Sequence, residues 1–583
     1  MSDPKYAEGA TSFSPIEPVV VGTQGSWTLV YTVGDNGLPL GAAIRISIPH
    51  GFSAPQSDNT DAPGFVSANL KSVEGAVTLT VDPPSGEAFD AETGEDGSPG
   101  VFLFVEQAPL RPGDTIRLIY GAGPGKAFAS VYAGTASFPI YVCSDGRAFP
   151  ERFFRTQTVP SLEVVSGEPQ LLEVTAPSGS EPGATVGLHV LARDQYGNRC
   201  AGWSGWLEVL PASWVNVPAA RRVEDPGGDG ITLNVGLSGS DVPESGVVSI
   251  QVRETDRDLL GTSNPIVVGR SAPFWGDLHA CLPEGSSSHK ELDFELAVGP
   301  QPTVKKTFFY FQTEARPDGQ RGAPAGGSGG GRRIGFLRFS LPDAQSDEMM
   351  PSHLLEIYSC WGNREYWGAP QPDIRYDRHP DRTAHAVLSQ GIVAGFAAGS
   401  NSRFGVGGDA RQAEAGRGYP GGLTGVYAES LTREALFTAL RERRCYSTTG
   451  ARIVMNVEMA GHEMGRLVEV RPDDTDLIRE RRISVLIHGT DVVEKIEVIR
   501  NNTEVCTYRG ESSSVSFNWS DRQDLNRIAL PRSMRGGSLT CYYFVRVTQA
   551  DGQMAWSSPI WFLLRPRRDG RGAEEEEREE AAN

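Results

Sequence analysis

The first part of the chain alternates hydrophobic and polar residues with a period of two. The alternation is clearest in four runs: SWTLVYTV (26–33), AAIRISIP (42–49), AVTLTVD (76–82) and DTIRLIYG (114–121). Alternation of this kind is typical of strands with one buried face, and the intervening PPSG and RPGD segments are rich in turn-forming residues. We therefore expect an antiparallel β-sandwich over residues 1–166.

A second β unit is predicted over residues 167–270. Its clearest feature is TVGLHVLARDQYGNRCAG (185–202), in which a strand runs into a polar turn. Gly197 and Asn198 are residue types that accept a positive φ and so can reverse the chain. The segment resembles the strand and turn of bacterial immunoglobulin-like repeats. An adhesive module and a structural spacer are both compatible with it, and the spacer is the preferred interpretation because such sandwiches host many functions.

The pattern changes over residues 271–470. HLLEIYS (353–359) and GIVAGFAA (391–398) are continuous apolar runs, as expected for strands that are buried on both faces. RTAHAVLSQG (382–391) predicts a short helix that ends at Gly391, and LTREALFTALRERR (431–444) predicts a helix that Thr432 caps. Strands that alternate with helices predict an α/β core.

Alternation returns over residues 471–567, in RISVLIHG (482–489), KIEVIRN (495–501), YYFVRVTQ (542–549) and SSPIWFLL (557–564). These runs predict a C-terminal β domain, and the charged residues 568–583 predict a disordered acidic tail. The expected fold class is therefore a multidomain α+β chain. It would comprise two N-terminal immunoglobulin-like β-sandwiches, a shortened α/β core and a C-terminal β domain.

Composition and charge narrow the classes of partner. A net charge of −19 argues against nucleic acid, which binds basic surfaces. No run of 18 apolar residues predicts a membrane span, and no signal peptide is seen, so we expect a cytoplasmic protein. The 7 cysteines form no CxxC pair, which favours free thiols, although Cys506 and Cys541 could pair if their strands are neighbours. A protein partner or a homo-oligomer stays open.

Three segments carry a resemblance to a known family. They are GDLH (276–279), LLEIYSCWGNREYW (354–367) and YPGGLTGVYAESLTREALFTALRERRCYSTTGARI (419–453). Together with segments of the N-terminal region they resemble a large bacterial family of unknown function, DUF3604. The core of that family is similar to the polymerase and histidinol phosphatase (PHP) domain, a metal-dependent phosphoesterase scaffold. The resemblance implies a PHP-like α/β core with divalent metals at one end of its strands.

The metal motifs of that family are incomplete in this chain. His279 matches the first histidine of Gly-Asp-Leu-His, but Cys281 stands where a second ligand is expected. Asn401 stands where the family has an aspartate, and no histidine follows it. Asp277 and Glu356 complete the set of candidate metal ligands.

Counting these ligands limits the chemistry. A cluster of two or three metals needs roughly six to nine protein ligands. His279, Cys281, Asp277 and Glu356 could hold one divalent ion, Zn or Mn, or none. The resemblance therefore implies a degenerate metal site.

Other residues are candidates for binding rather than catalysis. WGNREYWG (361–368) follows a buried strand, where ligands bind in α/β folds, so Trp361 and Glu365 are candidate pocket residues. Arg444 and Arg403 could hold an anion, with Asn401 beside them. The hydroxyls of CYSTTGARI (445–453) are expected to be structural first, because turn hydroxyls commonly bond the local backbone.

Two functions remain open. The first is a non-catalytic binding or structural protein that descends from a metallohydrolase. The second is a metal-dependent phosphoesterase or related hydrolase with a remodelled site. No catalytic residue can be assigned from the sequence.

Overall fold

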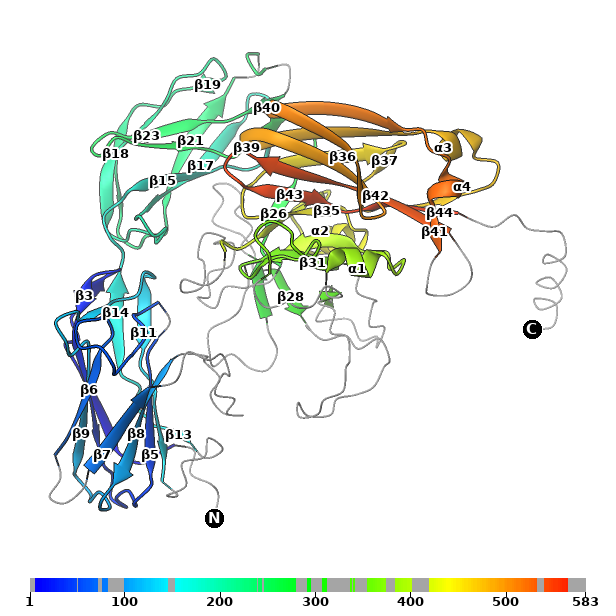
Figure 1. Ribbon diagram of the computed structural model, residues 1–583. Helices are drawn as coiled ribbons and strands as arrows, with labels where there is room; N and C mark the ends of the chain where they lie inside the picture. The colour runs from blue at the N-terminus through cyan, green and yellow to red at the C-terminus, as the bar shows by residue number, and fades with distance from the viewer. Residues whose placement is uncertain are drawn as a thin grey trace.

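The computed structural model describes residues 6–49, 51–71, 76–81, 99–144, 153–238, 240–243, 246–278, 354–373, 383–400, 419–531 and 539–564. The backbone alone is described at 291–294, 307–311, 336–337, 339–340 and 433–434. Over these residues the chain is a multidomain protein built mainly from β-strands (Figure 1). Its helices within this part are short: α1 Ala384–Leu388, α2 Arg433–Arg441, α3 Thr475–Arg479 and α4 Leu525–Ile528.

The first β-sandwich has two main sheets, of order β1-β4-β9-β6 and β13-β12-β5-β8-β7, with two smaller sheets beside them. The four runs predicted from the sequence form β4, β5, β7 and β9. Its strands are β1 Ala10–Ser14, β2 Val19–Val20, β3 Gln24–Gly25, β4 Trp27–Thr32, β5 Ala43–Ser47, β6 Val66–Lys71, β7 Ala76–Val81, β8 Gly100–Glu106, β9 Thr115–Tyr120, β10 Ala127–Phe128, β11 Gly134–Ser137, β12 Ile140–Cys143, β13 Phe154–Arg155 and β14 Ser161–Val165.

The second β-sandwich places a sheet of order β15-β17-β21-β19 over one of order β20-β18-β23-β24, and their inward residues share one hydrophobic core. Its strands are β15 Leu171–Thr175, β16 Gly179–Ser180, β17 Thr185–Arg193, β18 Trp203–Val209, β19 Val215–Asn216, β20 Arg221–Asp225, β21 Ile231–Leu237, β22 Val247–Val248, β23 Gln251–Glu254, β24 Leu259–Thr262 and β25 Ile266–Val268.

The rest of the described chain is organised around one large sheet, whose main path is β26-β34-β35-β43-β42-β39-β36-β37. A small sheet of β29, β31, β32 and β33 packs beside it, and a further small sheet joins β27, β28 and β30. The strands are β26 Phe274–Gly276, β27 Glu291–Phe294, β28 Thr307–Phe311, β29 Phe336–Leu337, β30 Phe339–Ser340, β31 Leu354–Ser359, β32 Gly362–Asn363, β33 Gly395–Ala398, β34 Leu423–Val426, β35 Cys445–Thr448, β36 Val454–Met459, β37 His462–Glu463, β38 Leu467–Val470, β39 Arg481–Arg500, β40 Thr503–Asp521, β41 Leu530–Pro531, β42 Leu539–Gln549, β43 Met554–Ser557 and β44 Ile560–Leu564.

The predicted fold class, with its PHP-like α/β core, is wrong. The two apolar runs do form β31 and β33, which pair in parallel with α1 between them, but this is a single βαβ unit. β26, β34, β35 and β43 pair antiparallel to one another. The prediction failed because it extended one parallel pair to a whole core, whereas the strands that follow β33 join an antiparallel sheet. The large antiparallel sheet here is covered by the β31 and β33 layer.

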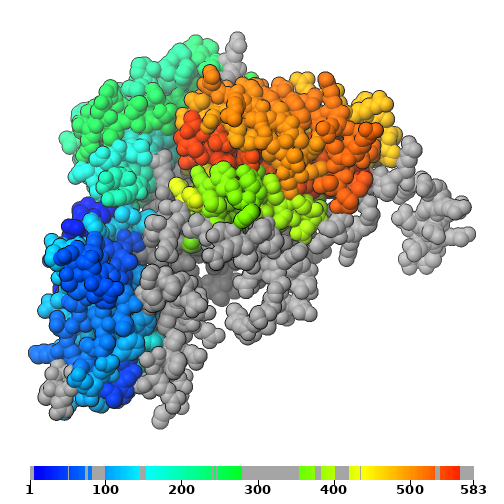
Figure 2. Space-filling view, viewed as in Figure 1, coloured from blue at the N-terminus to red at the C-terminus, as the bar shows by residue number. Residues whose placement is uncertain are grey.

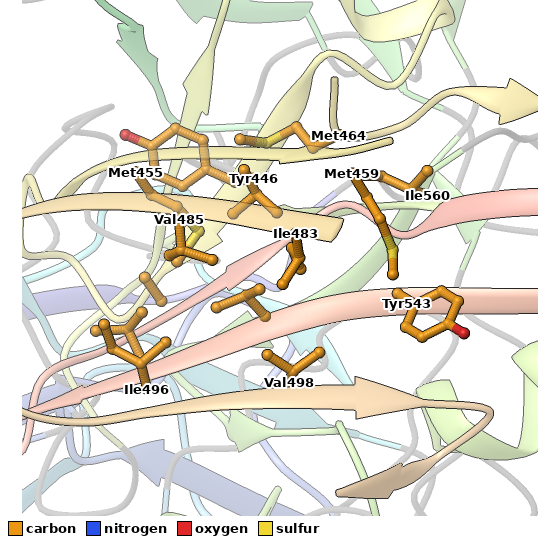
Figure 3. Close-up of a cluster of buried hydrophobic side chains, with 14 of the residues drawn as sticks. Tyr446, Met455, Met459, Met464, Ile483, Val485, Ile496, Val498, Tyr543 and Ile560 are labelled. Carbon is orange, nitrogen blue, oxygen red and sulfur yellow. The ribbon is translucent and has the colours of Figure 1, made fainter. Parts of the chain in front are cut away.

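The main hydrophobic core draws on residues from both sides of position 470. Figure 3 shows Tyr446, Met455, Met459 and Met464 packed against Ile483, Val485, Ile496, Val498, Tyr543 and Ile560. All of these side chains are almost completely removed from solvent. The large sheet and its core therefore continue across position 470, from β34 to β44, with β26 added at one edge.

Both predicted helices are present, and Thr432 caps α2 as predicted. Thr383 and Thr432 each accept a backbone N–H in the first turn of α1 and α2. Gly391 has a φ of +73°, the left-handed conformation that ends a helix. On α2, Leu436 and Leu440 are buried and Phe437 is partly buried, so one apolar face of the helix packs against the core.

Candidate functional site

The candidate residues divide into two groups. His279, Cys281, Asn401 and Arg403 lie outside the described residues. The second group lies within the described residues, in or near β26, β31 and β35. It comprises Asp277, Glu356, Trp361, Glu365 and Arg444. The geometry of the second group limits the chemistry that the site can support.

Asp277 follows β26 and is buried, with 3% of its surface exposed. Its Oδ1 atom accepts a hydrogen bond of 2.8 Å from the backbone N–H of Ser400, which follows β33. Thr424 ties the neighbouring strands together, since its hydroxyl bonds both the N–H and the carbonyl of Ala398. The fold thus brings the ends of two sequence-distant motifs, GDLH and the turn that contains Asn401, to one place.

Glu356 and Asp373 lie on either side of one arginine. Arg364 Nη1 is 3.5 Å from Glu356 Oε2, and Arg364 Nε bonds the Asp373 carboxylate. Burial is the larger effect on Asp373 and raises its pKa to about 6, although Arg364 opposes the rise. A guanidinium against Glu356 supplies the positive charge that a bound cation would otherwise supply.

Glu365 is completely buried, and both of its carboxylate oxygens have partners. Oε1 accepts from Arg546 Nη1 at 2.7 Å, and Oε2 accepts from Trp556 Nε1 at 2.8 Å. His385 Nε2 lies 3.6 Å from Oε1. Burial on its own would raise the pKa of Glu365, but the His385 and Arg546 contacts outweigh burial and hold this pKa below its usual range.

Arg546 joins Glu365 to a second buried carboxylate. Its Nε and Nη2 atoms form a two-pronged bond with Glu497, at 2.7 and 2.9 Å. Lys495 Nζ is 3.0 Å from Glu497, and the ring of Tyr366 stacks 5.4 Å from the Arg546 guanidinium carbon. Burial would raise the pKa of Glu497, but Arg546 and Lys495 outweigh burial and lower that pKa to about 2.

Sequence reasoning missed this network apart from Glu365. Arg546 and Glu497 lie in alternating β runs, where outward-facing charges are expected, so neither stood out. Both are nevertheless largely buried in the structure. The only local signal is that Lys495, Glu497 and Arg546 interrupt strands rich in Val and Ile.

Arg444 is paired with a nearby carboxylate. Its Nε is 3.2 Å from Glu442 of the same turn, and its backbone carbonyl accepts from Tyr427. Of the neighbouring hydroxyls, Thr448 bonds the local backbone as predicted and accepts from Gly450 N–H at 3.2 Å. Thr449 instead bonds a distant segment, since it donates to Gln553 at 2.6 Å and accepts from Met554 N–H at 2.9 Å. Trp361 is partly buried at the end of β31, and its backbone N–H reaches Ser359 Oγ at 3.4 Å.

Metal binding and disulfide pairing can be examined only in the part of the chain that the structure describes. There, no three His, Cys, Asp or Glu side chains converge as a metal site would require. Cys506 and Cys541 are free thiols: Cys506 faces Val498, whereas Cys541 faces Phe562. Within the same residues, no helix has the length and apolarity to cross a membrane.

Comparison with known proteins gives relatives without an assigned function. The chain is 32% identical over 225 residues to an uncharacterised protein of Chlamydia trachomatis, a match that covers 36% of this chain and 34% of that one. It is 34% identical over 215 residues to an uncharacterised protein of Chlamydia pneumoniae, with the same coverage. The chain thus spans about a third of the length of these curated relatives.

Among solved structures, an Escherichia coli adhesin, FdeC, aligns with 53% of this chain and 84% of its own. The identity is 11% and the TM-score 0.19, which is too low to indicate a shared fold. The family comparison is more specific, because residues 388–476, which include α2 and the CYSTTG turn, match the model described as "Protein of unknown function (DUF3604)". In this segment the chain is similar to that family.

Proposed function

We propose that this chain is a non-catalytic binding or structural protein. The observation that carries the proposal is the state of Glu365. This candidate site carboxylate is fully buried. One of its oxygens accepts a hydrogen bond from Arg546 and the other accepts one from Trp556. A carboxylate held in this way has a structural role, because a ligand would have to displace an arginine from a buried ion pair.

The second buried pair supports the same proposal. Glu356 and Asp373 share Arg364, so an arginine of the protein already lies against both carboxylates. Carboxylates that bind catalytic metals are normally free of such guanidinium neighbours, because the metal itself supplies the positive charge. The residues at this strand end therefore fit an inherited site that has become part of the scaffold.

One observation favours the alternative, a metal-dependent phosphoesterase or related hydrolase with a remodelled site. Asp277 and Ser400 meet at 2.8 Å, so the segments that carry His279 and Asn401 start from neighbouring points. In that case a divalent ion would polarise the substrate and activate water. His279, Cys281 and Asp277 would be its ligands.

A substrate panel separates the two functions. The full chain is assayed on chromogenic phosphoesters with added Zn²⁺ or Mn²⁺, beside His279→Ala and the control His462→Ala, which alters a histidine of β37. The proposal expects no turnover above that of buffer with metal, in all three proteins. Turnover that His279→Ala abolishes and His462→Ala retains would overturn it.

A further inference from the structure

The polar turn between β17 and β18 is built around one buried carboxylate. Asp194 is 2% exposed, and its Oδ1 accepts from the N–H groups of Tyr196 and Asn198, at 2.9 and 3.0 Å. Gly197 takes a φ of +85°, as its residue type allows. Asn198 does not adopt a positive φ, contrary to the prediction, so its side chain rather than its backbone explains its presence.

The Asn198 side chain leaves its own domain and bonds the first sandwich. Its Oδ1 accepts from Ala133 N–H at 2.9 Å, and its Nδ2 donates to the Val131 carbonyl at 2.8 Å. The same Nδ2 lies 3.0 Å from Asp194 Oδ2, and Asn198 is 2% exposed. Both the oxygen and the nitrogen of the Asn198 amide are therefore hydrogen-bonded, and they hold the loop from β10 to β11 at two points.

The same turn also holds the segment that connects the two sandwiches. Asp194 Oδ2 accepts from Gly167 N–H at 2.9 Å, and Gly167 lies between β14 and β15. Tyr196 packs over Gly22 of the first sandwich: a Cβ atom on Gly22 would lie 2.6 Å from the Tyr196 hydroxyl. Figure 2 shows the second sandwich, coloured cyan to green, in direct contact with the blue first sandwich.

We infer that the DQYGN turn (194–198) is an interdomain lock that makes the two N-terminal sandwiches one rigid body. It acts through three bonds to groups outside its own sandwich: to Val131, Ala133 and Gly167. Because Asp194 and Asn198 are buried in this joint, they offer no surface to an adhesive partner. The inference stands independently of whether the protein is an enzyme.

A second joint extends the rigid body to the large sheet. Trp275 Nε1 of β26 donates to Ser178 Oγ of the second sandwich at 2.7 Å, and the indole is buried against Tyr446. Arg452 Nη1 approaches Thr175 Oγ1 at 3.4 Å. The second sandwich therefore contacts the first sandwich at one joint and the large sheet at the other (Figure 1).

Hydrogen–deuterium exchange on the full chain tests the lock with Asn198→Asp. This change keeps the size of the side chain but replaces the donor with a carboxylate that faces Asp194 and the Val131 carbonyl. We expect exchange of peptides over residues 129–135 and 165–170 to rise about tenfold or more, because repulsion between the new carboxylate and Asp194 pushes the turn away from the amides of Ala133 and Gly167. Peptides over β18 and β21 stay protected, and the control Asn234→Asp on the exposed face of β21 changes neither segment.

Unchanged exchange in both segments of Asn198→Asp would overturn the inference. If Asn198→Asp instead unfolds the second sandwich, Ala133→Pro decides, since it removes the donor from the first sandwich and leaves the second untouched. The lock then predicts faster exchange at residues 165–170 and 194–198 and a broader distance distribution in small-angle X-ray scattering. Wild-type values for both would refute it.

Discussion

Arg546 Nη1 lies 2.7 Å from Glu365 Oε1 in the protein interior, although 181 positions separate the two residues in the chain. The contact joins the segment after β32 to the centre of β42. It thereby connects the part of the chain with the family resemblance to the C-terminal strands. Because Arg546 also bonds Glu497, one guanidinium bridges two buried carboxylates, and Lys495 supplies a second positive charge beside Glu497.

Arg546→Ala is expected to be strongly destabilising. The change leaves the carboxylates of Glu365 and Glu497 buried without their main partner, a loss that typically costs about 3–5 kcal/mol. The matched control is Arg253→Ala, which removes an arginine whose pair with Asp258 is solvent-exposed and should change stability little. Denaturant unfolding of the two variants measures the difference, and similar costs would show that the buried network is not a structural element.

His488 makes the stability depend on pH. It is 3% exposed and contacts Ser514 Oγ at 2.8 Å, and burial, with a smaller effect of Arg270, lowers its pKa to about 4. In the unfolded chain the imidazole titrates near pH 6.5. Between these values only the unfolded state takes up the proton, so the free energy of unfolding falls as pH falls from about 6.5 to 4.

The contribution of His488 is therefore full above pH 6.5 and is lost by about pH 4, with a size of about 1–3 kcal/mol. His488→Asn retains a polar group that can reach Ser514 but does not titrate. Urea unfolding at a series of pH values should show a shallower decline for this variant than for the wild type. A variant with the wild-type slope between pH 4 and 6.5 would assign the decline to other groups, and His462→Asn is the control.

Thr449→Val tests the structural role of the CYSTTG turn. The Thr449 hydroxyl is buried, donates to Gln553 and accepts from Met554 N–H at 2.9 Å, so the variant leaves buried partners without a bond. We expect a loss of about 1–3 kcal/mol. Arg444→Ala should cost only about 0–1 kcal/mol, because its partner Glu442 is substantially exposed. Thermal melting that shows a larger loss for Arg444→Ala would contradict this assignment.

Local features of the fold could be predicted from the sequence, because they depend on local chemistry. Alternation located β4, β5, β7 and β9, the Thr432 cap located α2, and Gly391 located the end of α1. Strand pairing was predicted less well, because it depends on segments that are distant from one another in the sequence. RISVLIHG and KIEVIRN form one strand, β39, because the chain between them stays extended through an irregular register at His488–Val493.

The candidate site shows the same division. The sequence located Asp277, Glu356 and Glu365, but their partners Ser400, Arg364 and Arg546 became apparent only in the structure. A carboxylate that binds a metal and one that bonds a distant arginine look alike in a single sequence. Spacing carries no information on a contact between residues 181 positions apart.

Elemental analysis of the purified full chain tests the central claim most directly. The protein is incubated with Zn²⁺ and Mn²⁺, dialysed and measured beside His279→Ala. Since Asp277 bonds a backbone N–H and Glu356 and Glu365 lie against arginines, we predict at most one metal ion per chain. Two or more tightly bound ions per chain, reduced in His279→Ala, would contradict the account and assign the chain a hydrolytic metal centre.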